Sequence, residues 1–380
     1  MIRPLWIEVD LKALRHNLEV VKNHMEPEVK IIATIKQSAY GHGLVPVARE
    51  LARAGIDFFG LGDIEEAISL REDGFRGSII ILSAILDKFV TYFLQYDLIP
   101  TIVDLEFAKK LNAEALRRGK TVSAHVKIDT GMGRLGLYYK KARVFIKKLS
   151  KLKNISLEGI YTHFPVADSD PEFTNYQIVA FNGFIRELKK EGIFFRFCHC
   201  ANSLGIINYP KAHFNMVRPG LVLYGVKPSP NLGLDIKPIL SLKSKVIFVK
   251  RIDRGRGVSY GRTYIADKPK AIATVAVGYA DGYPWSLSNR GKVIINNSFF
   301  NIAGRVCMDH VMIDLGDSKD IKIGQEVILI GKAKTARIRP EDLAQWAKTI
   351  PYEIVSRLSL KIPRVYNSFS SRWIGKKKGQ

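Results

Sequence analysis

The first residue that suggests chemistry is Lys36, because it follows a stretch that could form a buried strand. The residues Ile31–Ile35 precede it, and a turn with Tyr40, His42 and two glycines comes directly after it. In one interpretation, Lys36 is simply the first solvated residue after a core strand. In the other, its amine lies in a dry pocket and acts as a nucleophile that forms an imine with a carbonyl compound. The other polar residues must decide between the two.

Further polar residues follow later apolar segments in the same way: Lys127, Asp129, His163, Asn202, Ser203, Arg218 and Gly220. Taken alone, each has a plain interpretation, such as a core imidazole for His163, a surface ion pair for Arg218 and a helix cap for Asn202. In a parallel barrel, however, the carboxyl ends of all strands meet on one rim, where barrel enzymes carry their active sites. We therefore expect these side chains to converge.

The residue types on this rim suggest one cofactor. Ser203 and the amides near Gly220 would bind a phosphate, and Tyr40 would add a hydroxyl. Lys36 supplies an amine, and Arg218 supplies a guanidinium that is always charged. Together they suggest pyridoxal 5'-phosphate, an aldehyde that needs a lysine imine and a partner for its pyridine nitrogen.

Apolar segments and helical patterns alternate along the first part of the chain. The expected strands are residues 31–36, 57–61, 78–82, 98–103, 123–129, 157–163, 194–201 and 214–217. Asp63 and Glu66, three residues apart, predict a capping box at the start of one helix. The alternation predicts an α/β fold in which eight parallel strands close into an N-terminal (β/α)8 TIM-type barrel. A doubly wound open sheet is the alternative, but no G-x-G-x-x-G motif follows the first strand.

The pattern changes after residues 228–231, where short apolar strands replace the βα alternation. Asn296 and Asn297 could turn one hairpin, and one or two helices are expected between residues 340 and 358. We therefore expect a barrel over residues 1–235 and a C-terminal, mostly-β domain over residues 236–380. Residues 1–9 form an additional strand that could pair with the β domain instead.

The net charge of +23 raises the hypothesis of a nucleic-acid binder. Much of the excess lies in helix-like stretches such as residues 140–153, where Val144, Phe145 and Leu149 suit an inner face and the lysines an outer one. Aromatic residues are not interleaved with the basic runs, so we expect no specific nucleic-acid partner.

Other features of the composition suggest a cytoplasmic protein. The longest apolar run, residues 78–86, is too short for a bilayer, and the N-terminal residues lack a signal-peptide core. Three cysteines argue against a disulfide framework and for a reducing compartment. We therefore expect no membrane association.

Motifs in a fixed order carry the candidate residues: KQSAYGHG at Lys36, KIDTGMGRLG at Lys127, THF at His163, ANS at Asn202, RPGLVLYG at Arg218, GYADGYP at Gly278, GRVCMD at Gly304 and PYEI at Pro351. In sequence and order they resemble the alanine racemases, through nearly the whole chain. The resemblance implies an N-terminal barrel with a C-terminal β domain and pyridoxal 5'-phosphate as cofactor. It also implies interconversion of L- and D-alanine, which would supply D-alanine for peptidoglycan.

By this resemblance, Lys36 holds the cofactor and moves a proton on one face of the substrate carbon, and Tyr279 serves the opposite face. Two bases are needed because one base could only return the proton to the side it came from. A phenol with a pKa of about 10 is a poor base at neutral pH, so the resemblance makes His163 and Arg218 the candidates to stabilise its phenolate. Arg218 would also leave the pyridine nitrogen unprotonated, which favours reprotonation of the substrate carbon over transamination.

The resemblance extends to the substrate and the second subunit. Arg134 and the backbone amide of Met308 would bind the substrate carboxylate, and Lys127 matches a position that is carbamylated in many relatives, where it would hold Arg134. In this family Tyr279 and Met308 come from the β domain of a second subunit, which implies a homodimer with shared sites. The cofactor contacts implied are Lys36, Tyr40, His163, Asn202, Ser203, Arg218, Gly220 and Tyr352, and the entrance residues are Asp168, Arg305 and Ile350.

A few residues depart from the family pattern. Gln37-Ser38 follow Lys36 where Ala-Asn or Ala-Asp is usual, and Trp285 follows GYADGYP where arginine is common. Both would alter the pocket lining or the entrance without touching the bases. Cys198-His199-Cys200 lacks further ligands, and on a strand the histidine points away from the two cysteines, so we expect no metal.

Three other functions compete with an alanine racemase. A racemase of broader specificity, acting for example on serine, would keep all these residues. A decarboxylase with the related barrel would use an acidic partner for the pyridine nitrogen, where this chain offers Arg218. A non-catalytic pyridoxal-phosphate carrier would need neither Tyr279 nor the β domain.

Overall fold

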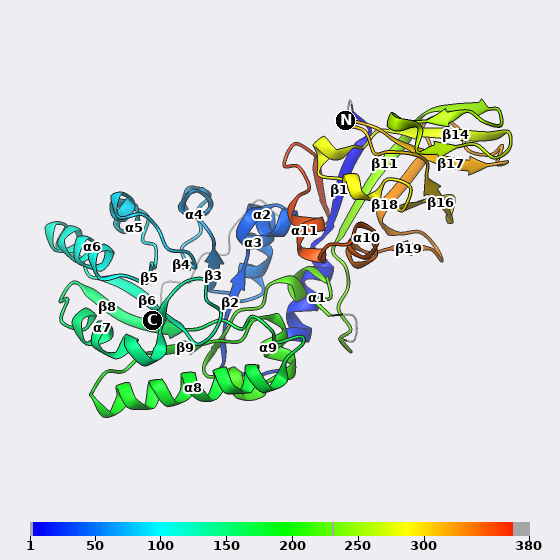
Figure 1. Ribbon diagram of the computed structural model, residues 1–380. Helices are drawn as coiled ribbons and strands as arrows, with labels where there is room; N and C mark the ends of the chain where they lie inside the picture. The colour runs from blue at the N-terminus through cyan, green and yellow to red at the C-terminus, as the bar shows by residue number, and fades with distance from the viewer. Residues whose placement is uncertain (1–2, 230–231, 368–380) are drawn as a thin grey trace. The chain divides into compact units, whose positions relative to one another are not determined.

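A computed structural model describes residues 3–229 and 232–367 of the chain (Figure 1). They form two compact units. The barrel unit comprises Leu18–Ala39 and Leu44–Leu223, and the β unit comprises the described residues of Met1–Asn17, Tyr40–Gly43 and Tyr224–Phe369. Within the described ranges, every helix is too short or too polar to cross a membrane.

The barrel unit is built on eight parallel strands. These are β2 (Lys30–Thr34), β3 (Phe58–Leu61), β4 (Ser78–Ile81), β5 (Thr101–Ile102), β6 (Val122–Asp129), β8 (Ile155–Tyr161), β9 (Phe197–His199) and β10 (Met216–Val217). They pair in the orders β10-β2-β3-β4 and β5-β6-β8-β9. A parallel bridge between Ile80 and Ile99 joins the two sheets on one side. On the other side, the amide of Arg218 donates to the carbonyl of Ala201 at 2.9 Å, and the predicted barrel is confirmed.

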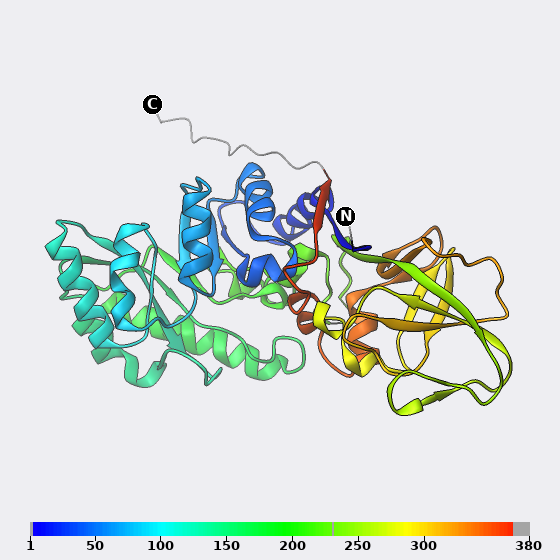
Figure 2. The ribbon, with the colours of Figure 1, turned by 90° about the horizontal axis from the view of Figure 1, so that it is seen from above.

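Helices lie outside these strands in both views (Figure 1 and Figure 2). They are α3 (Leu44–Arg53), α4 (Ile64–Glu72), α5 (Val90–Gln95), α6 (Leu105–Arg117), α7 (Ala142–Leu149), α8 (Pro171–Lys190) and α9 (Ser203–Asn208), with the short strand β7 (Leu137–Tyr138) beside β6. Inside, side chains from different strands pack into one cluster: Ile32, Ile80, Ile99, Phe197 and Met216. The strands are therefore nearly continuous apolar runs, as expected when both faces of a sheet are covered.

Helix α7 lies within the lysine-rich stretch of residues 140–153, for which an apolar inner face was predicted. Phe145, Ile146 and Leu149 are buried, which leaves the lysines on the outside. The placement of Val144 on the inner face was wrong, because that side chain is 62% exposed. Positions 142, 145, 146 and 149 lie on one stripe of a helix, and position 144 points away from it.

The turn after Lys36 has an unusual backbone. The segment α2 (Lys36–Gly41) has positive φ at Gln37, Ser38, Ala39 and Tyr40, with values of 54°, 53°, 52° and 54°. It is therefore a left-handed turn made of residues other than glycine. Such a conformation costs about 1–2 kcal/mol per residue because Cβ approaches the following carbonyl oxygen. The surrounding structure must hold it in place.

The β unit contains a closed ring of antiparallel strands. The ring runs through β18 (Glu326–Lys332), β15 (Lys292–Ile295), β16 (Ser298–Ile302), β17 (Val311–Gly316), β14 (Lys270–Val275) and β11 (Leu240–Ile252), and β11 pairs back to β18. The turn predicted at Asn296-Asn297 is confirmed, since both residues have positive φ and join β15 to β16. The predicted helices are α10 (Pro340–Ala347) and α11 (Pro351–Ser356).

Smaller elements complete this unit. They are β12 (Gly257–Val258), β13 (Tyr264–Ile265), β19 (Arg337–Ile338), β20 (Arg364–Asn367) and β1 (Leu5–Asp10), followed by α1 (Leu11–Lys22). The first strand, β1, pairs antiparallel with β11 and parallel with β20. Asp10 caps α1, because its carboxylate accepts from the amides of Lys12 and Ala13. The beginning of the chain is thus built into the β unit before the barrel strands start.

Candidate active site

Lys36 lies directly beyond the end of β2 on the barrel rim. The preceding residue, Ile35, is fully buried and donates its amide to the carbonyl of Gly60 on β3 at 3.0 Å. Burial lowers the pKa of the Lys36 amine, and the positive charge of Arg134 lowers it further. Of the two interpretations of Lys36, a half-buried amine with a lowered pKa fits this environment better than a freely solvated ammonium.

Lys127 projects from β6 into the same group of cations. Its side chain is 3% exposed, and its nitrogen lies 4.8 Å from the centre of the Tyr161 ring. Burial lowers the pKa of Lys127 to about 7, and the charges of Arg218, Arg134 and Lys36 contribute, whereas Asp129 opposes them. A large fraction of this amine is therefore neutral near pH 7.

Asp129 compensates this positive charge only in part. Its carboxylate accepts hydrogen bonds from the amides of Gly131, Met132 and Gly133, at 2.8, 2.9 and 3.0 Å. It thereby shapes the loop that leads to Arg134. Lys36, Lys127, Arg134 and Arg218 thus form a cluster of cations that favours bound anions.

Arg218, after β10, is buried at the centre of a chain of hydrogen bonds. Its Nη2 donates to the carbonyls of Thr162 and Cys200 at 2.7 and 3.1 Å and lies 3.3 Å from Nδ1 of His163. Its Nη1 donates to Nδ1 of His199. Burial, with Arg218 as the next cause, moves the pKa of His163 and of His199 well below the usual value, so both imidazoles are neutral.

This arrangement fixes the tautomers of two histidines. A guanidinium can only donate, so Nδ1 of His199 accepts and its proton is on Nε2. Nε2 of His199 then donates to Nδ1 of His125 at 2.9 Å, which places the His125 proton on Nε2. The strand between them, β8, has Gly159 at this level, where a Cβ would come within 2.4 Å of the His125 ring. Only glycine leaves room for this contact.

Ser203 and Asn202 lie at the start of α9. The amide of Gly220 donates to Oγ of Ser203 at 3.0 Å, so the residues predicted to bind phosphate after the seventh and eighth strands are brought together. The side-chain oxygen of Asn202 accepts from the amide of Gly205 at 2.9 Å and caps the helix. Asn202 is therefore a helix cap, as its plain interpretation predicts, and this does not prevent a contact with a cofactor.

In the β unit, Tyr40 and Tyr352 are neighbours. Their ring centres lie 6.3 Å apart, and the Tyr224 ring lies tilted beside Tyr40 with the ring centres 4.9 Å apart. Burial raises the pKa of Tyr40, and Tyr352 raises it further, so its hydroxyl keeps its proton and is available as a donor.

Tyr279 and Met308 are carried by two loops of the β unit that are bonded to each other. The amides of Tyr279 and Ala280 donate to the carbonyls of Cys307 and Met308 at 3.0 and 3.1 Å. A Cβ at Gly278 would lie 2.0 Å from the carbonyl oxygen of Met308, so this close approach requires glycine. The side chains of Tyr279 and Met308 are 45% and 53% exposed.

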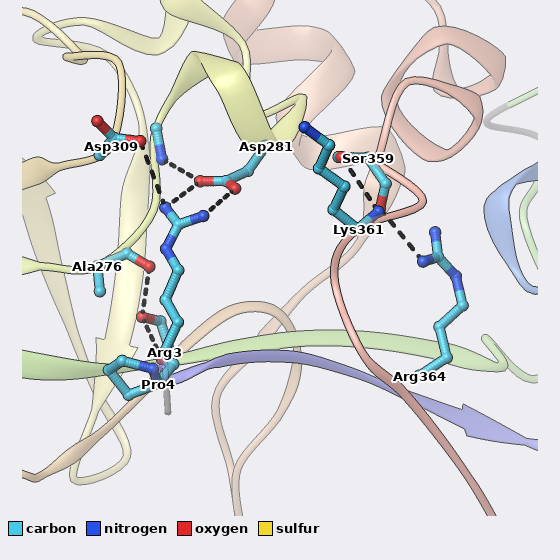
Figure 3. Close-up of polar contacts among 10 residues, drawn as sticks. Arg3, Pro4, Ala276, Asp281, Asp309, Ser359, Lys361 and Arg364 are labelled. Carbon is cyan, nitrogen blue, oxygen red and sulfur yellow. Dashed lines mark hydrogen bonds and ion pairs between the residues drawn. The ribbon is translucent and has the colours of Figure 1, made fainter. Parts of the chain in front are cut away.

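An ion pair holds the short helical turn η6 (Tyr279–Asp281) that presents Tyr279 (Figure 3). The Asp281 residue is 4% exposed, and Oδ2 of its carboxylate accepts from Nη2 of Arg3 at 2.7 Å and from the amide of Gly278 at 2.9 Å. The Asp281 Oδ1 accepts from Nη1 of Arg3. Figure 3 also shows the Arg3 guanidinium facing Asp309, 3.9 Å away, on the loop that carries Met308. One arginine therefore contacts both loops.

The three predicted entrance residues lie in different surroundings. Asp168 is exposed in the barrel unit, and Ile350 is 60% exposed in the β unit. The guanidinium of Arg305 lies 5.6 Å from the centre of the Trp285 ring. Trp285 also lines a pocket of about 760 Å³ in the β unit together with Tyr279.

The family models match the two parts of the chain in turn. The model described as alanine racemase, N-terminal domain, matches residues 9–228, and the model described as alanine racemase, C-terminal domain, matches residues 239–366. The chain belongs to the alanine racemase family. The resemblance found in the motifs is thereby confirmed.

Individual alanine racemases match over almost their whole length. The chain is 42% identical to the alanine racemase of Halothermothrix orenii over 369 residues, which are 96% of this chain and 97% of that protein. It is 41% identical to that of Carboxydothermus hydrogenoformans, covering 96% and 100%. The solved alanine racemase of Clostridium difficile 630 superposes with a TM-score of 0.90 at 36% identity, covering 96% of each chain.

Several residues of this alanine racemase family member were not found as site residues from the sequence. His125 and Arg3 act through partners 74 and 278 positions away in the chain, so no local motif indicates them. Asp281 lies within the GYADGYP motif, but its partner Arg3 could not be read from that motif. His199 was considered only with its neighbouring cysteines.

Burial raises the pKa of Cys198 to about 11 and also raises that of Cys200, so both thiols are protonated. Among the described residues, no three His, Cys, Asp or Glu side chains are grouped as metal ligands.

Proposed function

We propose that this protein is a pyridoxal-phosphate-dependent alanine racemase that uses Lys36 and Tyr279 as its two bases. The observation that carries the proposal is the environment of Lys36 in a member of this family: a half-buried amine, with a lowered pKa, beside Arg134 on a barrel rim. When bound, pyridoxal 5'-phosphate withdraws electrons from the substrate carbon and makes its hydrogen acidic.

The residues of the barrel unit fit this cofactor by their chemistry. Lys36 offers an amine that is neutral more often than an ordinary lysine, as attachment to an aldehyde requires. Arg218 makes its hydrogen bonds to described residues through Nη1 and Nη2, so its Nε–H would be the donor available to the pyridine nitrogen. Ser203 and Gly220 offer a hydroxyl and an amide to the phosphate, and we assign Tyr40 and Tyr352 to the same group.

The remaining cofactor and entrance residues are assigned in the same way. His163 and Asn202 contact the cofactor, and His163 also lies 3.3 Å from Nη2 of Arg218. We assign Asp168, Arg305 and Ile350 to the entrance, where Trp285 would alter the lining because its ring lies 5.6 Å from the Arg305 guanidinium.

The chain's own residues then divide the proton transfer. Lys36 takes or returns a proton on one face of the substrate carbon, and Tyr279 acts on the other face. Arg134 and the amide of Met308 bind the substrate carboxylate, which fixes the carbon between the two bases. Because a guanidinium keeps its proton, Arg218 would leave the pyridine nitrogen unprotonated, which would favour return of the proton to the substrate carbon.

Lys127 fits a carbamate. Its neutral amine would attack carbon dioxide, forming an N–C bond while one C=O bond of carbon dioxide becomes a carboxylate and the nitrogen releases one proton, which leaves an anion in place of the neutral amine. The positive charges that lower the pKa of Lys127 (Arg218, Arg134 and Lys36) would stabilise that anion. The carbamate would accept a charge-assisted hydrogen bond from Arg134 and fix it for the substrate.

We also propose a cytoplasmic homodimer in which Tyr279 and Met308 complete the site of the partner subunit. Both side chains are exposed although the two loops that carry them are tightly bonded, as expected of groups presented to a partner. The monomer would then be inactive. The product would supply D-alanine for peptidoglycan.

One assay tests the proposal. Purified protein with bound cofactor is incubated with L-alanine, L-serine and larger L-amino acids, and the products are separated by chiral chromatography. Fastest formation of the D-isomer from alanine is expected, and equal rates with serine would point to a broader racemase. Release of carbon dioxide would indicate a decarboxylase, and the absence of any racemised alanine would overturn the assignment.

A further inference from the structure

The left-handed turn after Lys36 is fixed by a carboxylate from another element. The amide of Gln37 donates to Oε2 of Glu66 at 2.9 Å, and the amide of Ser38 donates to Oε1 of the same carboxylate. Glu66 belongs to α4 (α2 and α4 in Figure 1). Both oxygens of one side chain therefore bind the first two amides of a turn whose backbone is strained.

The sequence predicted a different use for this residue. In the expected capping box, the Glu66 side chain would return to the amide of Asp63. Only half of that box is present among the described residues: Oδ1 of Asp63 accepts from the amide of Glu66 at 2.9 Å. The expected second half was wrong, because the Glu66 carboxylate extends to Gln37 and Ser38 instead. The helix is capped by Asp63 alone, and Glu66 is available for the turn.

The backbone bonds of the turn begin only after its first two residues. The amide of Ala39 donates to the carbonyl of Ile35 at 2.9 Å, whereas among the described residues the amides of Gln37 and Ser38 have Glu66 as their acceptor. Side chains other than glycine disfavour positive φ, so Gln37 and Ser38 would relax toward ordinary backbone angles if nothing held them. The two amides next to Lys36 are the ones that Glu66 binds.

The residue before this cap lies near the Lys36 side chain. A Cβ placed on Gly62, which precedes Asp63, would lie 3.7 Å from Cβ and 3.8 Å from Cδ of Lys36, so the backbone of Gly62 faces the stem of that side chain. Lys36 is therefore bordered by Gly62 and followed by the turn that Glu66 binds.

We propose that Glu66 is a positioning residue for Lys36: its carboxylate holds the left-handed turn and thereby aims the amine at the reacting atoms. The proposal rests on the proposed function only in naming Lys36 as the reacting amine. It assigns no contact between Glu66 and substrate or cofactor.

The test compares Glu66→Gln with a matched control on the same helix, Asp63→Ala. The glutamine keeps one acceptor but presents an NH2 group to the second amide, whereas Asp63→Ala removes the helix cap and leaves the turn alone. The first readout is hydrogen–deuterium exchange of a peptide that spans residues 36–40 in protein without added cofactor. We expect exchange there to rise about tenfold in Glu66→Gln, as for one lost charge-assisted bond, and to stay at the wild-type rate in Asp63→Ala.

The second readout is the rate at which pyridoxal 5'-phosphate attaches to Lys36, measured by borohydride trapping and peptide mass mapping. Glu66→Gln should slow attachment about tenfold, and Asp63→Ala should not. Ser38→Gly should restore much of the rate in the Glu66→Gln background, because glycine adopts positive φ without strain. Such a rescue would not occur if Glu66 only stabilised α4.

The outcomes separate the two proposals. Equal exchange and attachment in Glu66→Gln and Asp63→Ala would overturn the role of Glu66, whatever the wild-type activity. A wild-type protein that attaches the cofactor at Lys36 but racemises no alanine would overturn the function and leave the role of Glu66 standing.

Discussion

Replacing Lys127 with methionine distinguishes the free amine from the carbamate by the sign of its effect on stability. Methionine has nearly the same length and volume but no titratable group. In the free-amine state, Lys127 destabilises the fold because burial and the neighbouring cations disfavour its ammonium. In the carbamate state, the same cations surround an anion that compensates them.

The magnitude follows from the pKa, which is about 7 in the folded protein against an ordinary value of 10.5. Between these two values the unfolded chain binds the proton and the folded protein does not, so wild-type stability rises with pH. Each pH unit in this window is worth about 1.4 kcal/mol. Without carbon dioxide, Lys127→Met should therefore be more stable than wild type by roughly 3 kcal/mol at pH 8 and by roughly 1 kcal/mol at pH 9.5.

The assay is urea unfolding in carbon dioxide-free buffer and in bicarbonate. In bicarbonate the sign should reverse, and the variant should lose about 2–4 kcal/mol relative to wild type, because the cations lose their buried partner. A 13C resonance of a carbamate should appear in wild type with labelled bicarbonate and be absent from Lys127→Met. The control is Lys151→Met, which changes an exposed lysine and should stay within about 0.5 kcal/mol in both buffers. A variant less stable than wild type even without carbon dioxide would refute the reasoning.

Three further predictions concern other parts of the site. Tyr279→Phe should reduce the rate of racemisation by about a hundredfold or more. It should also slow deuterium exchange at the α carbon of L-alanine more than at that of D-alanine, as measured by NMR in D2O. Equal losses for the two isomers would contradict the assignment of the two bases to opposite faces. Arg218→Glu should give the pyridine nitrogen an acidic partner and therefore raise the ratio of pyruvate formed by transamination to alanine racemised. Pyruvate is measured with a coupled dehydrogenase. An unchanged ratio would contradict the role of Arg218. Arg3→Ala removes the guanidinium from the buried Asp281 carboxylate and leaves the bond from the Gly278 amide. We expect the free energy of unfolding in urea to fall by about 1–3 kcal/mol and turnover to decrease. The control Lys22→Ala, which breaks a surface pair with Glu19, should change neither quantity.

Much of the barrel was predictable from the sequence because its strands are buried on both faces. The apolar runs in the expected strands 31–36 and 78–82 were therefore recognised, and they correspond to β2 (Lys30–Thr34) and β4 (Ser78–Ile81). The shortest strands were placed less well: residues 194–201 were expected to form a strand, but β9 covers only Phe197–His199. Local composition cannot say how many residues of such a run find a pairing partner.

Periodicity and motif order are properties of neighbouring residues, so the alternation of strands and helices, the family motifs and the place of Lys36 after a strand could be predicted without the structure. The polar partners could not be predicted in this way. Glu66 serves Gln37 and Ser38 rather than its own helix, Arg3 pairs with Asp281, and Arg218 reaches His125 through His199. A hydrogen bond depends on which strands and helices become neighbours, and these partners are between 19 and 278 positions apart in the chain.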